Sequence, residues 1–249
     1  MLILVTGASA GFGEAISERL VGDGHRVVGI ARRGERLEAM RERLGPAFHP
    51  HVLDLADEAA TLGLLESLPA EFRAVDVLVN NAGLALGLDK AQSAKVEDWR
   101  RMIDINVIGL TLLTRAVLPG MVERNSGHVI NIGSTAGSYP YPGGNVYGAT
   151  KAYVRQFSLN LRADLAGTAV RVTNVEPGMV GGTEFSVVRF NGDADEARKR
   201  YEGVTALTAA DIAETVSWVA SLPKHVNVNT IELMPVAQSF GALQISRGL

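Results

Sequence analysis

Short apolar runs alternate with longer amphipathic segments along the chain. The apolar runs predict strands at residues 2–6, 26–31, 49–53, 75–80, 127–132, 169–176 and 230–234. Most are unbroken stretches of Val, Ile and Leu, as is typical of strands that are covered on both faces. Helical spacing between them predicts helices at 12–24, 34–44, 58–68, 98–124, 146–165 and 209–221. This alternation predicts one Rossmann-type α/β domain over residues 1–249, with helices on both faces of a doubly wound, parallel, seven-stranded sheet.

Residues 181–208 interrupt the alternation, because this segment is longer and more polar than the other connections. Long polar connections often act as lids over binding sites. We therefore expect a substrate lid at about 181–208.

Composition excludes several classes of protein. The chain has 249 residues, of which 47% are hydrophobic, and a net charge of −3. These values indicate a globular protein with no nucleic-acid partner. The apolar start lacks a basic leader and predicts a first strand rather than a signal peptide. No apolar stretch is expected to reach the length of a membrane span, so we expect no membrane partner. The absence of cysteine excludes disulfides and fits a cytoplasmic location.

A glycine-rich turn, T-G-A-S-A-G-F-G at 6–13, follows the first predicted strand and opens a helix. In this context the glycines favour dinucleotide binding. Gly7 allows the tight turn, Gly11 lets the backbone approach a pyrophosphate, and Gly13 lets the helix pack closely on the sheet. The helix start supplies N–H groups and the positive end of its dipole. The spacing differs from G-x-G-x-x-G, so a purely structural turn is the alternative.

Arg32 and Arg33 follow the second predicted strand, where a site that prefers NAD usually has an acidic residue. Two guanidinium groups there favour a 2′-phosphate, through charge-assisted hydrogen bonds. The pair therefore predicts NADP as the cofactor, with a solvated helix start as the alternative.

Polar residues follow two further strands of the predicted sheet. Asp54 and Leu55 come after the third strand, and the sequence N-N-A-G at 80–83 closes the fourth. Ligands of open α/β sheets bind outside the carboxyl ends of the strands. We expect Asp54 and Leu55 to meet the adenine ring, and 80–83 to line the adenosine and ribose. An ordinary strand-to-loop transition is the alternative for each.

Ser134 ends the fifth predicted strand, and Tyr147 and Lys151 lie four residues apart in the next helix. That spacing places the phenol and the ammonium on one helix face. A phenol has a reference pKa near ~10, which a neighbouring ammonium lowers. We expect Tyr147 to donate and accept the reacting proton, Lys151 to lower its pKa, and Ser134 to hold the substrate oxygen. A surface tyrosine packed on a lysine stem is the alternative.

Together these motifs resemble the short-chain dehydrogenase/reductase family. The resemblance rests on 6–13, 80–83, Asn106, Ser134, Y-G-A-T-K at 147–151, and Pro177 with Gly178, and it covers essentially the whole chain. It implies that Asn106, Ser134, Tyr147 and Lys151 are catalytic, with Asn106 holding a water that relays protons to Lys151. The implied cofactor contacts are Gly7, Ser9, Ala10, Gly11, Phe12, Gly13, Arg32, Arg33, Asp54, Leu55, Asn81, Ala82, Gly83, Tyr147, Lys151, Pro177, Gly178, Val180 and Thr183. The loop before Thr183 is one residue longer than the family pattern P-G-x-V/I-x-T, which bears on the contact of Thr183 with the nicotinamide carboxamide.

Within the family, the stretches 114–124, 141–147, 176–185 and 234–238 resemble NADP-dependent members that act on 3-hydroxy acids. This resemblance implies reversible hydride transfer between NADP and a small 3-hydroxy acid or β-hydroxy amino acid, such as serine, allo-threonine or 3-hydroxypropionate. The alternatives are a reductase of another small ketone or aldehyde, and an NADP-binding regulator without catalysis. Arg189, in the expected lid, is a candidate for binding a carboxylate, with a solvated surface arginine as the alternative. The histidines show no ligand spacing, so no metal is expected.

Apolar residues in 98–124 and 146–165 spread around more than one side of each helix. Such a distribution is typical of helices with an exposed apolar face. The family pairs these helices across two-fold axes, which implies a homotetramer, with the tail 234–249 near a subunit boundary. Burial of both helices within a single subunit is the alternative.

Overall fold

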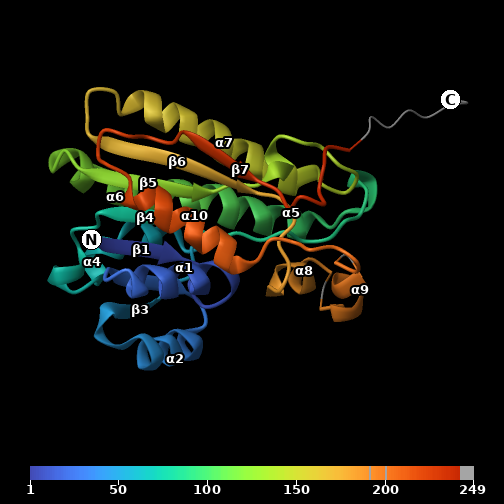
Figure 1. Ribbon diagram of the computed structural model, residues 1–249, viewed down its shortest axis with the longest axis horizontal. Helices are drawn as coiled ribbons and strands as arrows, with labels where there is room; N and C mark the ends of the chain where they lie inside the picture. The colour runs from blue at the N-terminus through green and yellow to red at the C-terminus, as the bar shows by residue number, and fades with distance from the viewer. Residues whose placement is uncertain (191, 200, 242–249) are drawn as a thin grey trace, which may run out of the picture.

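The computed structural model describes residues 1–190, 192–199 and 201–241. It contains the predicted parallel sheet of seven strands, in the order β3-β2-β1-β4-β5-β6-β7 (Figure 1). The strands are β1 Leu2–Thr6, β2 Arg26–Ala31, β3 Phe48–Val52, β4 Val77–Asn80, β5 Gly127–Ile132, β6 Val170–Pro177 and β7 Thr230–Leu233. All seven predicted strands are present in a single domain, which confirms the predicted fold class.

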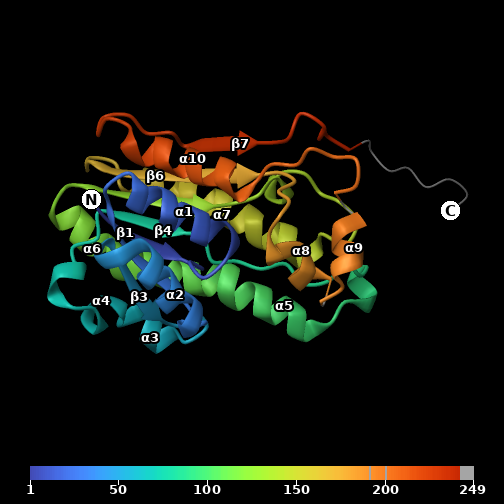
Figure 2. The same ribbon diagram turned by 60° about the horizontal axis from the view of Figure 1, so that its bottom comes forward.

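Helices cover both faces of the sheet. One face carries α1 Gly11–Gly22, α2 Gly34–Leu44 and α10 Ala209–Ser221. The other carries α5 Val96–Ile103, α6 Leu110–Glu123 and α7 Asn145–Asp164, with the short helices α3 Glu58–Leu62 and α4 Leu64–Ser67 beside them (Figure 2). Because side chains alternate along a strand, Ile3 packs with α1 and α10, while Leu4 packs with α6 and α7. Four 3₁₀ turns complete this frame: η1 Gly45–Ala47, η2 Ala70–Phe72, η3 Ala91–Ser93 and η5 Thr135–Gly137.

The helix predicted at 98–124 is continuous from Val96 to Glu123, but its middle, η4 Asp104–Gly109, has π-helical geometry. These 28 residues are long and apolar enough to cross a membrane by length and composition alone, so the expectation that no stretch reaches that length was wrong. The run lies along one face of the sheet, and 44% of its most apolar window is buried inside the domain. Its apolar character therefore serves the core.

The segment 181–208 contains two short helices, α8 Glu184–Arg189 and α9 Ala194–Lys199, which the sequence did not predict. They lie beyond the carboxyl ends of the strands, apart from the two helical layers (Figure 1). Thr183 caps α8, since its hydroxyl accepts a hydrogen bond from the Phe185 N–H. Their position places them next to the edge of the sheet where sites form.

Candidate active site

A cavity of about 700 Å³ opens at the carboxyl edge of the sheet. It lies beside the switch point between β1 and β4, where ligands bind in open α/β sheets. Most of the predicted site residues line it, namely Gly7, Ser9, Ala10, Gly11, Phe12, Arg32, Arg33, Asp54, Leu55, Asn81, Ala82, Gly83, Ser134, Tyr147, Lys151, Pro177, Gly178, Val180 and Thr183. The other two, Gly13 and Asn106, lie directly behind the wall. Segments that are far apart in the chain therefore meet at one cavity.

The glycine-rich turn has the backbone that its sequence predicts. Gly7 and Gly11 have φ angles of 67° and 57°, a region that favours glycine. A Cβ atom on Gly13 would lie 2.2 Å from the Gly7 carbonyl oxygen, so only glycine lets α1 start this close to β1. Asn81 supports the turn, because its Nδ2 donates to the Thr6 carbonyl at 2.8 Å. The exposed start of α1 therefore fits the pyrophosphate of a dinucleotide.

Basic groups gather beside this turn. Arg33 donates from Nε to the Ser9 hydroxyl at 3.2 Å and from Nη1 to a Glu184 oxygen at 2.8 Å. Arg36 donates to the other Glu184 oxygen at 2.9 Å. The two arginines lower the pKa of the Glu184 carboxyl. Two guanidinium groups that hold a carboxylate also fit a 2′-phosphate, so the donors present here match NADP.

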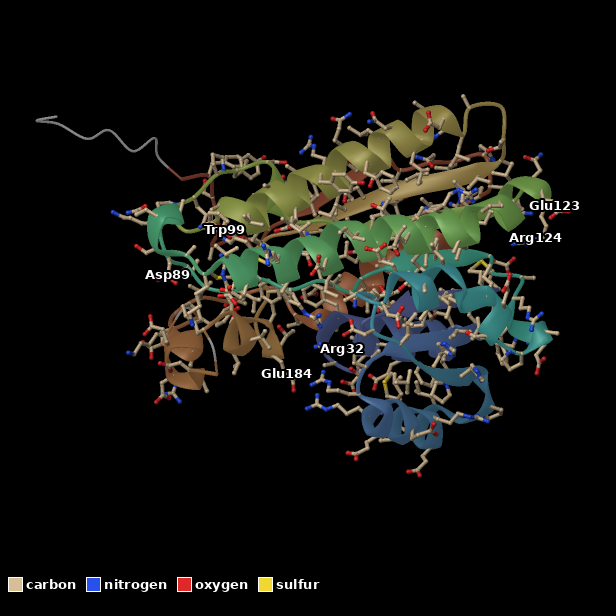
Figure 3. All side chains as sticks on the ribbon, turned by 180° about the vertical axis from the view of Figure 1, so that it is seen from behind. Arg32, Asp89, Trp99, Glu123, Arg124 and Glu184 are labelled. Atoms are coloured by element: carbon tan, nitrogen blue, oxygen red, sulfur yellow. The ribbon has the colours of Figure 1, made fainter. Side chains whose placement is uncertain are left out.

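Arg32 points away from this group. Its Nη1 lies 3.7 Å from Asp54 Oδ2, and Arg101 of α5 donates to the same oxygen at 3.2 Å. Figure 3 shows Arg32 and Glu184 where α8 meets the N-terminal part of the chain. Of the predicted pair, only Arg33 therefore joins the group of donors around Glu184, which we call the Arg33 anion site. Arg32 lies beside Asp54, the residue expected to meet the adenine ring.

Asn106 lies within the π segment and connects three parts of the chain. Its side chain accepts from the Leu84 N–H at 2.9 Å, and donates to the Leu84 carbonyl and the Thr150 hydroxyl. A Cβ on Gly83 would lie 3.3 Å from Asn106 Oδ1 and 3.4 Å from Lys151 Nζ. Gly83 thus lets Asn106 and Lys151 approach each other. The π-helical segment thus brings Asn106 to the site, as is frequent for irregular helical turns at functional positions.

Tyr147 and Lys151 are both buried on the first two turns of α7. The predicted lowering of the tyrosine pKa by Lys151 does not occur in this structure. Burial raises the pKa of Tyr147 to about 12, and Ser134 and Arg189 act against that rise. Burial also lowers the pKa of Lys151 to about 8, and its ammonium donates to the Ile132 carbonyl at 2.7 Å. The desolvation of the phenol therefore outweighs the neighbouring charges.

Aromatic side chains pack around the Tyr147 ring. The rings of Tyr147 and Phe185 lie 5.9 Å apart, and Tyr141 packs in the same cluster. Gln238, after β7, accepts from the Met179 N–H at 2.7 Å and so covers the loop that follows Pro177. This side of the cavity suits a small substrate.

The lengthened loop after Pro177 brings Thr183 to the glycine-rich turn. A Cβ on Gly11 would lie 3.5 Å from the Thr183 Cβ. Thr183 therefore faces the glycine-rich turn, while Val180 forms a parallel bridge with Leu207. The predicted contact with the nicotinamide carboxamide stays a prediction.

Sequence reasoning missed several residues of the site. These are Arg36, Arg101, Tyr141, Glu184, Phe185 and Gln238. Arg36 alone carried a local signal, since it lies three residues after Arg33, in the first turn of α2. The others reach the cavity through tertiary contacts that no local pattern encodes.

Comparison with known proteins agrees with this geometry. Residues 1–192 match the family model for short chain dehydrogenases. The chain belongs to this family.

The chain is 64% identical to the NADP-dependent 3-hydroxy acid dehydrogenase YdfG of Salmonella typhi over 247 residues, covering 99% of this chain and 100% of that protein. It is 53% identical to a serine 3-dehydrogenase of Rhizobium radiobacter, with 98% of each chain covered. Its fold matches the closed form of a serine dehydrogenase complexed with NADP⁺, with a TM-score of 0.98, 60% identity and full coverage of both chains.

Proposed function

We infer that this chain is an NADP-dependent oxidoreductase that transfers a hydride reversibly between NADP and a small 3-hydroxy acid or β-hydroxy amino acid. The observation that carries this conclusion is the meeting of Ser134, Tyr147 and Lys151 at one cavity with the glycine-rich turn and the Arg33 anion site. The similarity to a 3-hydroxy acid dehydrogenase and a serine 3-dehydrogenase supports the substrate class.

Tyr147 carries the proton of the reaction. NADP, when bound, supplies the nicotinamide carbon that accepts or returns the hydride. In oxidation Tyr147 first passes its own proton toward Lys151 and then, as phenolate, takes the proton of the substrate hydroxyl. In reduction the neutral phenol donates its proton to the carbonyl oxygen. Its pKa of about 12 keeps the phenol neutral at physiological pH, a state ready to donate. Ser134 donates a hydrogen bond to the substrate oxygen.

Lys151 and Asn106 connect this proton to the rest of the protein. Lys151 has a pKa of about 8 and can exchange a proton near neutrality, and its ammonium also orients the ribose of the cofactor. Asn106 positions Lys151 across Gly83, where both side chains converge. A water held there relays protons outward.

Arg33 and Arg36 bind the 2′-phosphate, and the segment 181–208 closes over the site as a lid. Four hydrogen bonds support the lid. Glu184 accepts from Arg33 and from Arg36, the Gly87 N–H donates to the Arg189 carbonyl at 3.0 Å, and Tyr201 donates to the Val180 carbonyl at 2.9 Å. The lid helices are thereby fixed to both sides of the cavity.

The chain assembles as a homotetramer in this proposal. Ile103 on α5, Val122 on α6, and Tyr153 and Leu159 on α7 are exposed apolar side chains. The two helical elements are neighbours, since the Thr111 and Tyr153 hydroxyls lie 2.9 Å apart. A second copy related by two-fold symmetry would bury this surface. The tail expected at a subunit boundary extends beyond the described residues after Gly241.

Purified protein tests the proposed function directly. With NADP⁺, a panel of serine, allo-threonine, 3-hydroxypropionate and neutral secondary alcohols should give reduced cofactor with the acids and much less with the alcohols. Turnover of neutral carbonyl compounds alone would favour a different reductase. NADPH binding without turnover of any substrate would favour a regulator.

A further inference from the structure

Arg189, the last residue of α8, extends into the cavity wall above the proposed proton carrier. Its guanidinium carbon lies 5.4 Å from the centre of the Tyr147 ring and 5.3 Å from that of Tyr141. Nη2 donates to the Tyr141 hydroxyl at 2.6 Å. Two aromatic faces and one phenol thus hold the guanidinium next to the reacting group.

The charge of Arg189 has no acidic partner within ion-pair distance among the described residues. Its Nε is buried and has no hydrogen-bond partner there either. A buried donor without a partner is costly, and a buried charge even more so. An anion that enters the cavity would supply the missing acceptor.

The other basic side chains of the described cavity wall are already engaged. Arg32 and Arg101 face Asp54, and Arg33 faces Glu184. Lys151 is buried and donates to the Ile132 carbonyl. Arg189 is therefore the cation on the substrate side that can accept a new carboxylate without losing an ionic partner.

We propose that Arg189 binds the carboxylate of the substrate and so selects acids whose hydroxyl lies close to the carboxylate. The proposal rests on the function inferred above. A guanidinium can donate two parallel hydrogen bonds to one carboxylate, here through Nε and a terminal nitrogen. The Arg189 guanidinium lies over the Tyr147 ring. A substrate whose carboxylate binds this guanidinium therefore reaches the Tyr147 oxygen with its hydroxyl only if few carbon atoms separate the two groups. In a 3-hydroxy acid, one carbon separates the carboxyl carbon from the carbon that bears the hydroxyl.

Tyr141 is a positioning residue in this arrangement. Its hydroxyl accepts the hydrogen bond from Nη2 and orients the planar guanidinium, which leaves the edge with Nε for the substrate. The Gly87 N–H donates to the Arg189 backbone carbonyl at 3.0 Å, which holds the end of α8 in this position. The lid thus carries the residue that recognises the acid.

The test compares 3-hydroxypropionate with its neutral methyl ester, using NADP⁺ and the full-length protein. The wild type should prefer the acid. In Arg189→Met the ratio of kcat/KM for acid to ester should fall by roughly 10- to 100-fold, as expected for the loss of a charge-assisted pair of hydrogen bonds. Arg189→Lys should keep part of the preference, since it retains the charge but not the fork of donors. Arg198→Met, an exposed arginine paired with Asp195 on α9, is the control and should leave the ratio unchanged.

A binding measurement keeps the test decisive if turnover is lost. Propionate should compete with 3-hydroxypropionate or bind the NADP⁺-loaded wild type in calorimetry, while propionamide should not. Arg189→Met, with NADPH affinity and melting temperature intact, should lose this difference. If Arg189→Met keeps the acid-to-ester ratio and the propionate affinity of the wild type, the proposal for Arg189 is wrong but the proposed function stands. A wild type that oxidises the ester but not the acid overturns the proposed function as well.

Discussion

Glu184, on helix α8 of the proposed lid, accepts a 2.8 Å hydrogen bond from Nη1 of Arg33, which lies 151 positions earlier in the chain. Arg33 also donates to Ser9 in the glycine-rich turn. The carboxylate of the lid therefore shares its donors with the site proposed for the 2′-phosphate. A cofactor that carries this phosphate meets both the arginines and the negative charge of Glu184.

Glu184→Gln should increase the preference for NADPH over NADH, because it removes a negative charge next to the proposed phosphate site and frees donors of Arg33 and Arg36. The dissociation constants of both cofactors, measured by fluorescence, give the preference. Glu196→Gln on α9, where Glu196 pairs with Lys199, is a matched control with no expected effect. An unchanged preference in Glu184→Gln would place the 2′-phosphate elsewhere.

Replacing arginines one at a time should separate their roles. Arg33→Ala and Arg36→Ala should each weaken the binding of NADPH by about 1.5–3 kcal/mol, the usual range for hydrogen bonds to a charged group, with little effect on the binding of NADH. Arg32→Ala should cost much less, because Arg32 is exposed and turns toward Asp54. The ratio of kcat/KM for NADP⁺ and NAD⁺ measures the difference. Equal losses in all three variants would contradict the assignment of Arg33 and Arg36.

Tyr147→Phe should lower kcat by about 10²–10⁴, the range for loss of a general acid or base. The ring still packs against Phe185, so the melting temperature and the affinity for NADPH should change little. Stopped-flow measurement of a single turnover isolates the chemical step. Tyr153→Phe, on the exposed side of α7, should retain kcat. A near-normal rate in Tyr147→Phe would remove the phenol from the mechanism.

His128 should make the protein less stable in mild acid. Burial lowers the pKa of His128 to about 3, and its Nε2 lies 2.8 Å from the Thr173 hydroxyl. The folded state keeps the ring neutral, whereas the unfolded chain takes up a proton below its ordinary pKa of 6.5. The contribution of the neutral His128 ring to the free energy of unfolding is therefore complete above pH 6.5, and it is lost as the pH falls from 6.5 toward about 3.

Urea unfolding at pH ~7.5 and ~5 tests this linkage in the wild type and in His128→Gln, which keeps polar contacts but does not titrate. Between these values the wild type should lose about 2 kcal/mol more of its free energy of unfolding than the variant, from ~1.4 kcal/mol per pH unit below the unfolded pKa. The same loss in both proteins would show that other groups control acid stability.

Light scattering at micromolar concentration tests the assembly. The wild type should have the mass of a tetramer. Leu159→Glu places a charge on the exposed apolar surface of α7 and should reduce that mass, while Leu62→Glu on α3 should not, although Leu62 is also exposed. A monomeric wild type with full activity would show that this surface needs no partner.

The sequence by itself determined the strands, the sheet and much of the site. An unbroken apolar strand such as β1 is buried only where both faces of the strand are covered. The number and order of such strands along the chain therefore predict the parallel sheet. Gly7 and Gly11 are equally direct, because their positive φ angles and the close approach of Gly13 to Gly7 admit few other residues. The spacing from Tyr147 to Lys151 fixes their common helix face by helical geometry alone.

Tertiary structure alone decided how the charges and the lid are arranged. The six-residue helices α8 and α9 are too short to be specified by periodicity and depend on contacts such as Glu184 with Arg33. The π geometry around Asn106 accompanies hydrogen bonds from its side chain to Leu84 and Thr150, which lie 22 and 44 positions away in the chain. Burial raised the pKa of Tyr147 where its neighbour in sequence predicted a lower value. In each case the deciding term is desolvation or a long-range contact, and neither is encoded by residues adjacent in the chain.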